Sequence, residues 1–318
     1  MADVTLKSLH PFLQHNSTIL DSDTRIESYT HDHGDGIILC MVHGYPQSSY
    51  MWRHVVPALK DSYSLFVPEL PNYGISTTSR PWNKRDHGHL LLRILHATLK
   101  SGSTRPIIWC SHDRGARIGH RLLTSASELT QNIKAAIFMD IVPSLEQWKS
   151  FANPAASVAY FHWPFLARPD APEMITSMGG AKYCRLIMER GKGQSSTGVE
   201  SMQSDGAWEH YCAVFDTKAA IDGSCADYTN GAMPECDAQT EDQKAGRKVQ
   251  VPLLVLYSEG SLARMHDVPK VWKDWATGEL ECVGVGEGHG HYFPESKPEF
   301  VVEQVKRWVA QVMKSSSL

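Results

Sequence analysis

The feature that most constrains the fold of this chain is a regular alternation of short apolar runs with segments of helical periodicity. Six apolar runs end in small or polar residues, at positions 37–42, 64–68, 106–110, 135–139, 252–257 and 281–285. Segments with apolar residues at helical spacing lie between or after them, at positions 51–60, 87–99, 117–127, 268–276 and 299–313. Strands that feed crossover helices build a mostly parallel sheet. The alternation therefore predicts an α/β fold with a doubly wound, mostly parallel sheet.

The alternation stops between residues 143 and 246, where Trp, Tyr, Met and Pro cluster and the pattern turns helical without intervening strands. We interpret residues 144–246 as a helical cap domain inserted into a core domain of residues 1–143 and 247–318. Such caps lie over the carboxyl ends of the strands, where α/β proteins bind ligands, so we expect aromatic and polar cap residues to line a pocket. Residues 232–248 are polar and poor in large apolar side chains. This composition predicts a linker that returns to the core.

Composition and charge argue against several classes of partner. The 318 residues include 31 basic and 35 acidic side chains without long like-charge blocks, which argues against a nucleic-acid or anionic-membrane partner. The apolar runs are shorter than the roughly 20 residues of a membrane helix, and the N-terminal segment lacks a signal-peptide pattern. Seven scattered cysteines show neither metal-ligand spacing nor a disulfide framework. We expect a cytoplasmic protein that acts on a small molecule without a metal or another cofactor.

Asp113 stands between a predicted strand and a predicted helix. The sequence Ser-His-Asp-Arg-Gly at residues 111–115 has the small-x-nucleophile-x-small form of a nucleophile elbow, a tight turn that lifts one side chain above the sheet edge. A carboxylate at this position attacks an sp³ carbon by displacement and forms an alkyl ester, which water later cleaves. An Asp at this position can also simply cap the following helix. The elbow spacing directly after a strand favours the nucleophile.

Two further segments supply groups that cleavage of such an ester needs. His-Gly-Tyr-Pro at residues 43–46 follows a predicted strand, and the backbone N–H groups of Tyr45 and Arg114 are expected to bind the oxyanion. The base that activates water is expected after the last strand, where His289 and His291 lie. We prefer His291, because a Gly-His pair followed by aromatics, Pro and Glu just before the last helix is the usual form. Gly-His at residues 288–289 leaves His289 as the alternative.

The histidine also needs an acid that orients its imidazole and stabilises the imidazolium. Asp140 follows the strand predicted at residues 135–139, whereas Glu259 and Asp267 follow the strand predicted at residues 252–257. Asp140 stands at the carboxyl end of its strand, and Glu259 is followed by a flexible Gly-Ser turn. We therefore favour Asp140.

Taken together, these segments resemble the fluoroacetate or haloacetate dehalogenases of the α/β-hydrolase superfamily. The resemblance runs from about residue 37 to the C-terminal helix. Its most specific segment is Asp-Arg-Gly-Ala-Arg at residues 113–117. That family pairs its nucleophile with two arginines at this spacing, which clamp the substrate carboxylate, and Arg114 and Arg117 match them. The resemblance thus implies the α/β-hydrolase fold and hydrolytic cleavage of a carbon–halogen bond through an ester of Asp113.

The resemblance extends into the cap. Tyr-Phe-His-Trp at residues 160–163 and Gly-Ser-Cys-Ala-Asp-Tyr at residues 223–228 are similar to the family segments that surround the leaving halide. The resemblance makes His162, Trp163 and Tyr228 halide-binding donors. It also supports Asp140 as the acid, because the family acid falls in an Asp-Ile-x-Pro segment, and it implies a homodimer.

Some positions depart from the family pattern. Ser111 stands where the family has glycine, Glu-Leu-Pro-Asn-Tyr-Gly at residues 69–74 replaces the usual Asp-Leu-Arg-Gly-Tyr-Gly, and no basic residue follows Tyr228. An epoxide hydrolase with the same Asp, His and acid is the alternative enzyme, and cap tyrosines 160, 211 and 228 are available to it. A hydrolase-fold binding protein with little turnover is a weaker alternative, because every catalytic position is filled.

Overall fold

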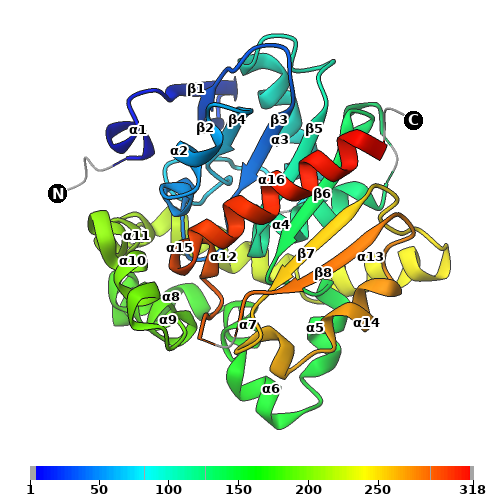
Figure 1. Ribbon diagram of the computed structural model, residues 1–318. Helices are drawn as coiled ribbons and strands as arrows, with labels where there is room; N and C mark the ends of the chain where they lie inside the picture. Colours follow the sequence, from blue (N-terminus) through cyan, green and yellow to red (C-terminus); the bar gives the residue numbers. More distant parts are fainter. Residues whose placement is uncertain (1–4, 82, 126, 287, 316–318) are drawn as a thin grey trace.

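An eight-stranded sheet runs through the centre of the computed structural model, which describes residues 5–81, 83–125, 127–286 and 288–315 (Figure 1). The strands are β1 (Gln14–Asp21), β2 (Thr24–His31), β3 (Ile38–Val42), β4 (Ser64–Pro68), β5 (Ile107–His112), β6 (Ile133–Met139), β7 (Leu253–Tyr257) and β8 (Leu280–Gly284). They are ordered β1-β2-β4-β3-β5-β6-β7-β8. Strand β2 pairs antiparallel with β1 and β4, and the other neighbours are parallel.

The predicted doubly wound, mostly parallel sheet is confirmed, and β3 to β8 match the six predicted strands to within two residues at each end. The hairpin of β1 and β2 was not predicted. Most side chains of β1 are exposed at the edge of the sheet, and buried positions of β2 include Thr24, Glu27, Ser28 and Thr30. These two strands therefore lack the apolar runs from which the other six strands were predicted.

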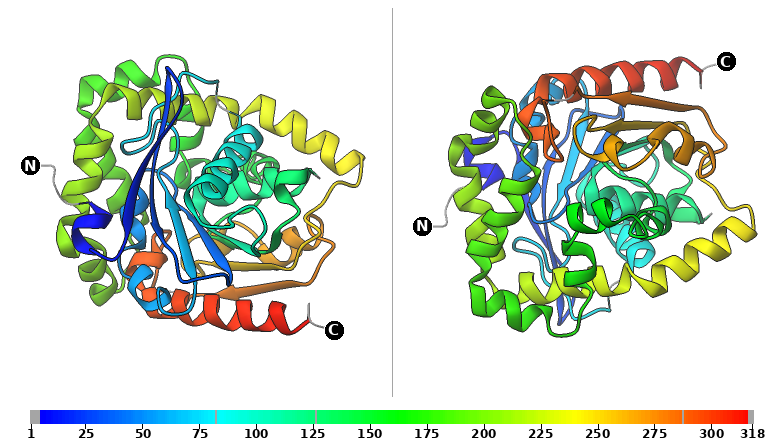
Figure 2. Two further views of the ribbon diagram at one scale, coloured as in Figure 1. Left: turned by 90° about the horizontal axis from the view of Figure 1, so that it is seen from above. Right: turned by 90° about the horizontal axis from the view of Figure 1, so that it is seen from below.

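Helices cover both faces of the sheet. Helices α3 (Lys84–Thr98) and α4 (Asp113–Leu123) lie on one face, and α16 (Pro298–Ser315) crosses the other (Figures 1 and 2). The helix predicted over residues 51–60 is instead a 3₁₀ turn (Ser49–Trp52) followed by the single turn α2 (Val56–Leu59). Pro57 explains the break, because its ring removes a backbone donor and clashes with the preceding turn of a continuous helix. Within the described residues, no helix is long and apolar enough to cross a membrane.

The connection from β6 to β7 is helical, and we call residues 144–246 the helical insertion. Its helices are α5 (Ser144–Ser150), α6 (Pro154–Ala159), α7 (His162–Leu166), α8 (Ala171–Met178), α9 (Gly180–Gly191), α10 (Ser196–Gln203), α11 (Ala207–Phe215), α12 (Lys218–Asn230) and α13 (Met233–Lys244). In Figure 1 the green helices of this insertion gather at one end of the sheet, and yellow α13 leads back toward β7. The division of the chain into a core domain and a cap domain stays a prediction.

Helix α13 corrects the prediction of a linker at residues 232–248. The buried face of α13 is polar and consists of Glu235, Gln239 and Asp242 at helical spacing. Arg121 of α4 forms ion pairs with Glu235 (3.0 Å) and Asp242. Apolar periodicity cannot reveal a helix that packs through ion pairs, because periodicity detects only an apolar face.

Candidate active site

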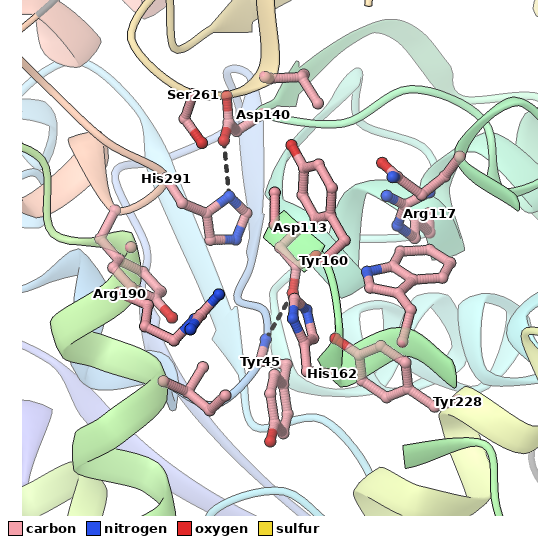
Figure 3. A pocket seen from close by; sticks show the side chains of 17 residues that line it. Tyr45, Asp113, Arg117, Asp140, Tyr160, His162, Arg190, Tyr228, Ser261 and His291 are labelled. Atoms are coloured by element: carbon pink, nitrogen blue, oxygen red, sulfur yellow. Dashed lines mark hydrogen bonds and ion pairs between the residues drawn. The ribbon is translucent and has the colours of Figure 1, made fainter. Parts of the chain in front are cut away.

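A pocket lies between the carboxyl ends of the strands and the helical insertion (Figure 3). Its volume is about 90 Å³, well below the roughly 300–1,000 Å³ of pockets for drug-sized ligands, so it suits a small molecule. The core lines it with Tyr45, Asp113, Arg117, Asp140 and His291, among others. The insertion contributes Tyr160, His162, Trp163, Arg190 and Tyr228, among others.

Asp113 occupies a sharp turn between β5 and α4. Its φ of 43° lies in the left-handed region, a strained conformation for a residue with a side chain that costs about 1–3 kcal/mol and persists only where the surroundings impose it. Two glycines allow the turn to pack closely. A Cβ on Gly115 would lie 2.6 Å from the carbonyl oxygen of His43, and a Cβ on Gly44 would lie 2.5 Å from the Cβ of Asp113. The local structure is therefore that of the predicted elbow.

The carboxylate of Asp113 meets the backbone of the loop after β3. The N–H of Tyr45 donates a hydrogen bond to Oδ2 of Asp113 at 2.9 Å. The N–H of Arg114 lies in the first turn of α4, where backbone donors have no partner within the helix. These are the two donors that the sequence assigned to the oxyanion. Oδ1 of Asp113 accepts no hydrogen bond from the described residues, so it is the oxygen free to attack.

A buried contact between His43 and Glu69 supports the loop that carries Tyr45. Oε2 of Glu69 lies 3.1 Å from Nε2 of His43, and both side chains are buried. The hydroxyl of Ser49 donates to Glu69 as well. Glu69 stands where the resembling family has aspartate. The longer side chain thus holds the loop from behind without entering the pocket.

His291 is oriented by Asp140. Nδ1 of His291 lies 2.7 Å from Oδ2 of Asp140, and Oδ1 of Asp140 accepts two hydrogen bonds from the N–H and hydroxyl of Ser258, both at 2.7 Å. Burial alone would lower the pKa of His291, but the hydrogen bond and the charge of Asp140 raise it above its ordinary value. An imidazole held through Nδ1 presents Nε2 to the pocket, which is the geometry that a general base needs.

The alternative residues lie elsewhere. Nδ1 of His289 is 2.9 Å from the hydroxyl of Ser296, and His289 is not among the residues that line the pocket. Glu259 packs against Gly284 of β8, and Asp267 caps α14 (Val268–Lys273) by accepting from the N–H of Lys270 at 3.1 Å. Of these candidates, the structure brings His291 and Asp140 together beside Asp113.

Asp113 is buried, yet its surroundings favour the charged form. Burial alone would raise the pKa of its carboxyl group, but the positive charges of His291 and Arg114 outweigh burial and hold the pKa below its ordinary value. The group is therefore a carboxylate at neutral pH. An ionised oxygen with no hydrogen bond is the form of Asp113 that can act as a nucleophile.

Arg117 is a buried cation without an acidic partner. Only 4% of it is exposed, its Nη1 donates to the carbonyl of Val142 at 2.7 Å, and its Cζ lies 4.4 Å from the ring centroid of Trp163. Among the described residues, no carboxylate forms an ion pair with it. Burial, followed by the nearby charge of Arg114, lowers its pKa to about 10, so it stays protonated at neutral pH. The carboxylate of Asp113 offsets part of this effect by raising the pKa of Arg117, but it forms no ion pair with the guanidinium, which an anion in the pocket can therefore bind directly.

Arg114 differs from the sequence prediction. Its Nε and Nη2 bind Oδ2 and Oδ1 of Asp227 at 2.6 and 2.7 Å, and Asp227 is also 3.2 Å from Nζ of Lys84. Arg114 is absent from the pocket lining. The predicted pair of clamping arginines is therefore incomplete, because the guanidinium of Arg114 already holds a carboxylate of the protein. The backbone N–H of Arg114, in the first turn of α4, keeps the predicted oxyanion role as a proposal.

The three predicted halide donors line the pocket together. The ring centroid of Tyr228 lies 5.9 Å from that of His162 and 5.5 Å from that of Trp163. Burial lowers the pKa of His162 to about 3 and raises the pKa of Tyr228, so both groups are neutral and can donate. None of the three side chains has a hydrogen-bond partner in the described parts of the chain. Figure 3 shows His162 and Tyr228 beside Asp113. Neighbouring donors without partners can bind an anion in the pocket.

Four functional positions were missed by the sequence argument. Ser258 holds Asp140, Asp227 pairs with Arg114, and Ser261 and Arg190 line the pocket. No motif marks Ser261 or Arg190. Asp227 stands beside Tyr228, but nothing in the sequence indicates that it meets a residue more than one hundred positions away. Tyr211, one of the three tyrosines open to an epoxide enzyme, instead donates to Glu295 at 2.8 Å and does not line the pocket.

Comparison with known proteins agrees with this geometry. Residues 37–160 match the model of the α/β hydrolase fold. The chain is 28% identical to a fluoroacetate dehalogenase of Burkholderia sp over 84% of both chains, and 25% identical to a soluble epoxide hydrolase of Corynebacterium sp. strain C12 over 87% of this chain and 91% of that one. Among solved structures it is similar to a mutant of a Pseudomonas aeruginosa protein provisionally assigned as an epoxide hydrolase. The TM-score is 0.81 at 26% identity, over 96% of this chain and 98% of that chain.

Proposed function

This chain belongs to the α/β-hydrolase superfamily, and we propose that within it the protein is a hydrolytic dehalogenase of small 2-haloacids. The proposal rests on two features that occur together in one small pocket. Arg117 is a buried cation without an acidic partner in the described residues, and three neutral donors beside Asp113 lack hydrogen-bond partners. A 2-haloacid supplies a carboxylate for the first feature and a departing halide for the second. Similarity to a fluoroacetate dehalogenase supports the same substrate class.

In the first step the substrate carboxylate binds Arg117, which fixes the α-carbon against Asp113. Oδ1 of Asp113 attacks the α-carbon from the side opposite the halogen. The new bond joins this oxygen to carbon, and the halide leaves with the electron pair of the carbon–halogen bond. Fluoride is small and strongly hydrated, so it leaves readily only where donors replace its water. His162, Trp163 and Tyr228 are proposed to provide one imidazole N–H, one indole N–H and one phenol O–H.

In the second step Nε2 of His291 accepts a proton from water, and the resulting hydroxide attacks the ester carbonyl of Asp113. The backbone N–H groups of Tyr45 and Arg114 stabilise the oxyanion. Collapse of this intermediate breaks the bond between the carbonyl carbon and the alkyl oxygen, and the imidazolium of His291 protonates that oxygen. The 2-hydroxyacid departs. Asp113 returns as a carboxylic acid that loses its proton, so the cycle converts haloacid and water into hydroxyacid, halide and a proton.

Epoxide hydrolysis is the second candidate. Tyr160 and Tyr228 both line the pocket, and burial raises the pKa of both hydroxyl groups, so they can donate to an epoxide oxygen. The similarity to a soluble epoxide hydrolase also supports it. A neutral epoxide, however, would give Arg117 no direct ion-pair partner. We therefore rank the haloacid first.

The test is release of halide from fluoroacetate and chloroacetate, run beside diol formation from a panel of small epoxides. We expect halide release from the acids and little diol. Asp113→Asn should lower halide release by several orders of magnitude, because an amide cannot form the ester. In a single turnover in heavy-oxygen water, label should enter Asp113 before it enters product. Diol formation without halide release would reject the dehalogenase, and label that appears only in first-cycle product would reject the covalent route.

A further inference from the structure

Arg190 is a second cation in the pocket, and it comes from the helical insertion. It lies near the C-terminal end of α9 and lines the pocket together with Ile187 and Gly191 of the same helix. Its Nη2 donates to the carbonyl of Val158 at 3.2 Å, and its Cζ lies 4.8 Å from the ring centroid of Phe161. In Figure 3 its guanidinium points into the pocket on one side of Asp113, and Arg117 lies on the other side.

Two other exposed arginines of the insertion form ion pairs with acids. Arg185, five residues earlier on α9, pairs with Glu209 at 3.2 Å, and Arg168 pairs with Asp170 at 2.6 Å. The acid next to Arg190 in sequence, Glu189, pairs with Lys192 instead. Arg190 has no ion pair within the described ranges. It is exposed, as Arg185 and Arg168 are, but unlike them it lines the pocket.

The two unpaired arginines therefore face one substrate from opposite sides of the attacking carboxylate. A single carboxylate attached to the reacting carbon binds at Arg117 and leaves Arg190 without a partner. A substrate with a second carboxylate, separated from the reacting carbon by one methylene group, offers each of the two cations an anionic partner. Ala159 and Ile187, which line the pocket with Arg190, provide apolar contact for that methylene group. An arginine fork suits a carboxylate particularly well, because it can bind both oxygens.

We propose that Arg190 binds a distal carboxylate and that the preferred substrate class is an α-halo dicarboxylate such as 2-chlorosuccinate. This inference rests on the proposed dehalogenase function and narrows its substrate. The chemistry is unchanged: Oδ1 of Asp113 bonds to C2, chloride leaves with the bonding electrons, and water cleaves the ester. The product is a 2-hydroxy dicarboxylate with inverted configuration at C2. The distal carboxylate takes no part in bond making or breaking.

The experiment measures chloride release from three substrates: 2-chlorosuccinate, its C4 monoamide and chloroacetate. The monoamide has nearly the same size as the dicarboxylate but lacks the second charge. Wild type should prefer the dicarboxylate to the monoamide in kcat/KM by about five- to thirtyfold, the range of a charge-assisted contact reduced by partial exposure. Arg190→Gln should remove this preference, mainly by raising KM for the dicarboxylate. High salt should weaken the preference in wild type, because the site is partly exposed.

Arg185→Gln is the matched control, because it removes an arginine of the same helix that does not line the pocket. It should leave all three kcat/KM values within about twofold of wild type. Arg190→Lys keeps the charge and should retain part of the preference for the dicarboxylate. The preference therefore tests a contact at Arg190 and not the net charge of the helix.

The outcomes separate this inference from the proposed function. Chloride release from chloroacetate with no preference for the dicarboxylate over the monoamide overturns the inference and leaves the dehalogenase intact. An equal loss on all three substrates in Arg190→Gln also overturns it, because Arg190 would then attract anions in general. Release of chloride from none of the acids rejects the dehalogenase itself, and this inference with it.

Discussion

The two walls of the pocket differ in how their polar groups are satisfied. The sheet wall holds polar groups that are already paired within the protein, namely the backbone N–H of Tyr45, Oδ2 of Asp113, the carboxylate of Asp140 and Nδ1 of His291. The insertion wall holds polar groups that lack a side-chain partner in the described residues, namely His162, Trp163, Arg190 and Tyr228. Paired groups are held in position before a ligand arrives, whereas unpaired donors gain their partners from it. We infer that the sheet wall carries the chemistry and the insertion wall selects the substrate.

Arg117 is the exception that links the two walls. It belongs to α4, on the sheet side, but it lacks an acidic partner and stacks against Trp163 of the insertion. Arg114 of the same helix, by contrast, has an acidic partner, because it forms an ion pair with Asp227 of α12. An arginine paired within the protein and an arginine that lines the pocket thus lie three positions apart on one helix. Four substitutions test this division between the walls, beginning with the largest expected effect.

The first substitution removes the base from the sheet wall. His291→Asn should still allow displacement but should block hydrolysis of the ester, so turnover falls by several orders of magnitude and an Asp113 adduct accumulates. Mass spectrometry of the intact protein after incubation with chloroacetate measures the adduct. His289→Asn is the control and should turn over without an adduct. An adduct in the His289 variant, with normal turnover in the His291 variant, would reverse the assignment.

The second substitution breaks the pair that closes the insertion onto α4. Asp227→Asn leaves the charges of Arg114 and Lys84 buried without compensation, so the free energy of unfolding should fall by about 3–5 kcal/mol. Urea denaturation followed by tryptophan fluorescence measures it. Asp170→Asn removes the acid of a surface pair and should change stability little. If Asp227→Asn unfolds at the urea concentration of wild type, Arg114 is not a structural arginine.

The third substitution tests Arg117 as the site of the substrate carboxylate. Arg117→Lys keeps the charge but loses the planar fork, so kcat/KM for haloacids should fall roughly ten- to a hundredfold, or about 1.5–3 kcal/mol. Activity on chloroacetamide, which carries no charge, should change much less. Arg185→Lys provides a variant of equal chemistry outside the pocket. Unchanged haloacid turnover in Arg117→Lys would remove the carboxylate site and favour epoxide hydrolysis.

The smallest expected effect is a shift in pH dependence. His291 must be neutral to accept a proton from water. Because Asp140 raises its pKa above the ordinary value, turnover should fall as the pH drops through that raised pKa. Displacement should continue there, because the pKa of Asp113 is held low, and the ester should accumulate. Asp140→Asn should move the acid limb to lower pH, which pH profiles of halide release and adduct will show. An acid limb at the same pH in the variant would separate Asp140 from His291.

Much of the sheet wall could be predicted because its parts are local. The elbow at Asp113 needs a strand, a turn with small neighbours and a helix, and all three are contiguous in the sequence. Asp140 directly follows a strand, and His291 lies in the loop after the last strand. The carboxyl ends of parallel strands lie at one edge of the sheet. Chain order and local spacing were therefore sufficient to nominate them. Their catalytic roles remain proposals that the substitutions above test.

The sequence by itself determined the alternation of strands and helices of an α/β sheet, the turn at Asp113 and the aromatic run at His162 and Trp163, because each depends on residues close together in the chain. The tertiary structure decided which buried charges have partners. Asp227 forms an ion pair with Arg114, which lies more than one hundred positions away in the chain. Helix α13, where a linker was expected, packs through an ion pair with Arg121. Arg190 of α9 lines the pocket. Ion pairs depend on distance in space and on burial, and neither is encoded in local spacing. For that reason the number of arginines beside Asp113 was evident from the sequence, while the number free to bind substrate was not.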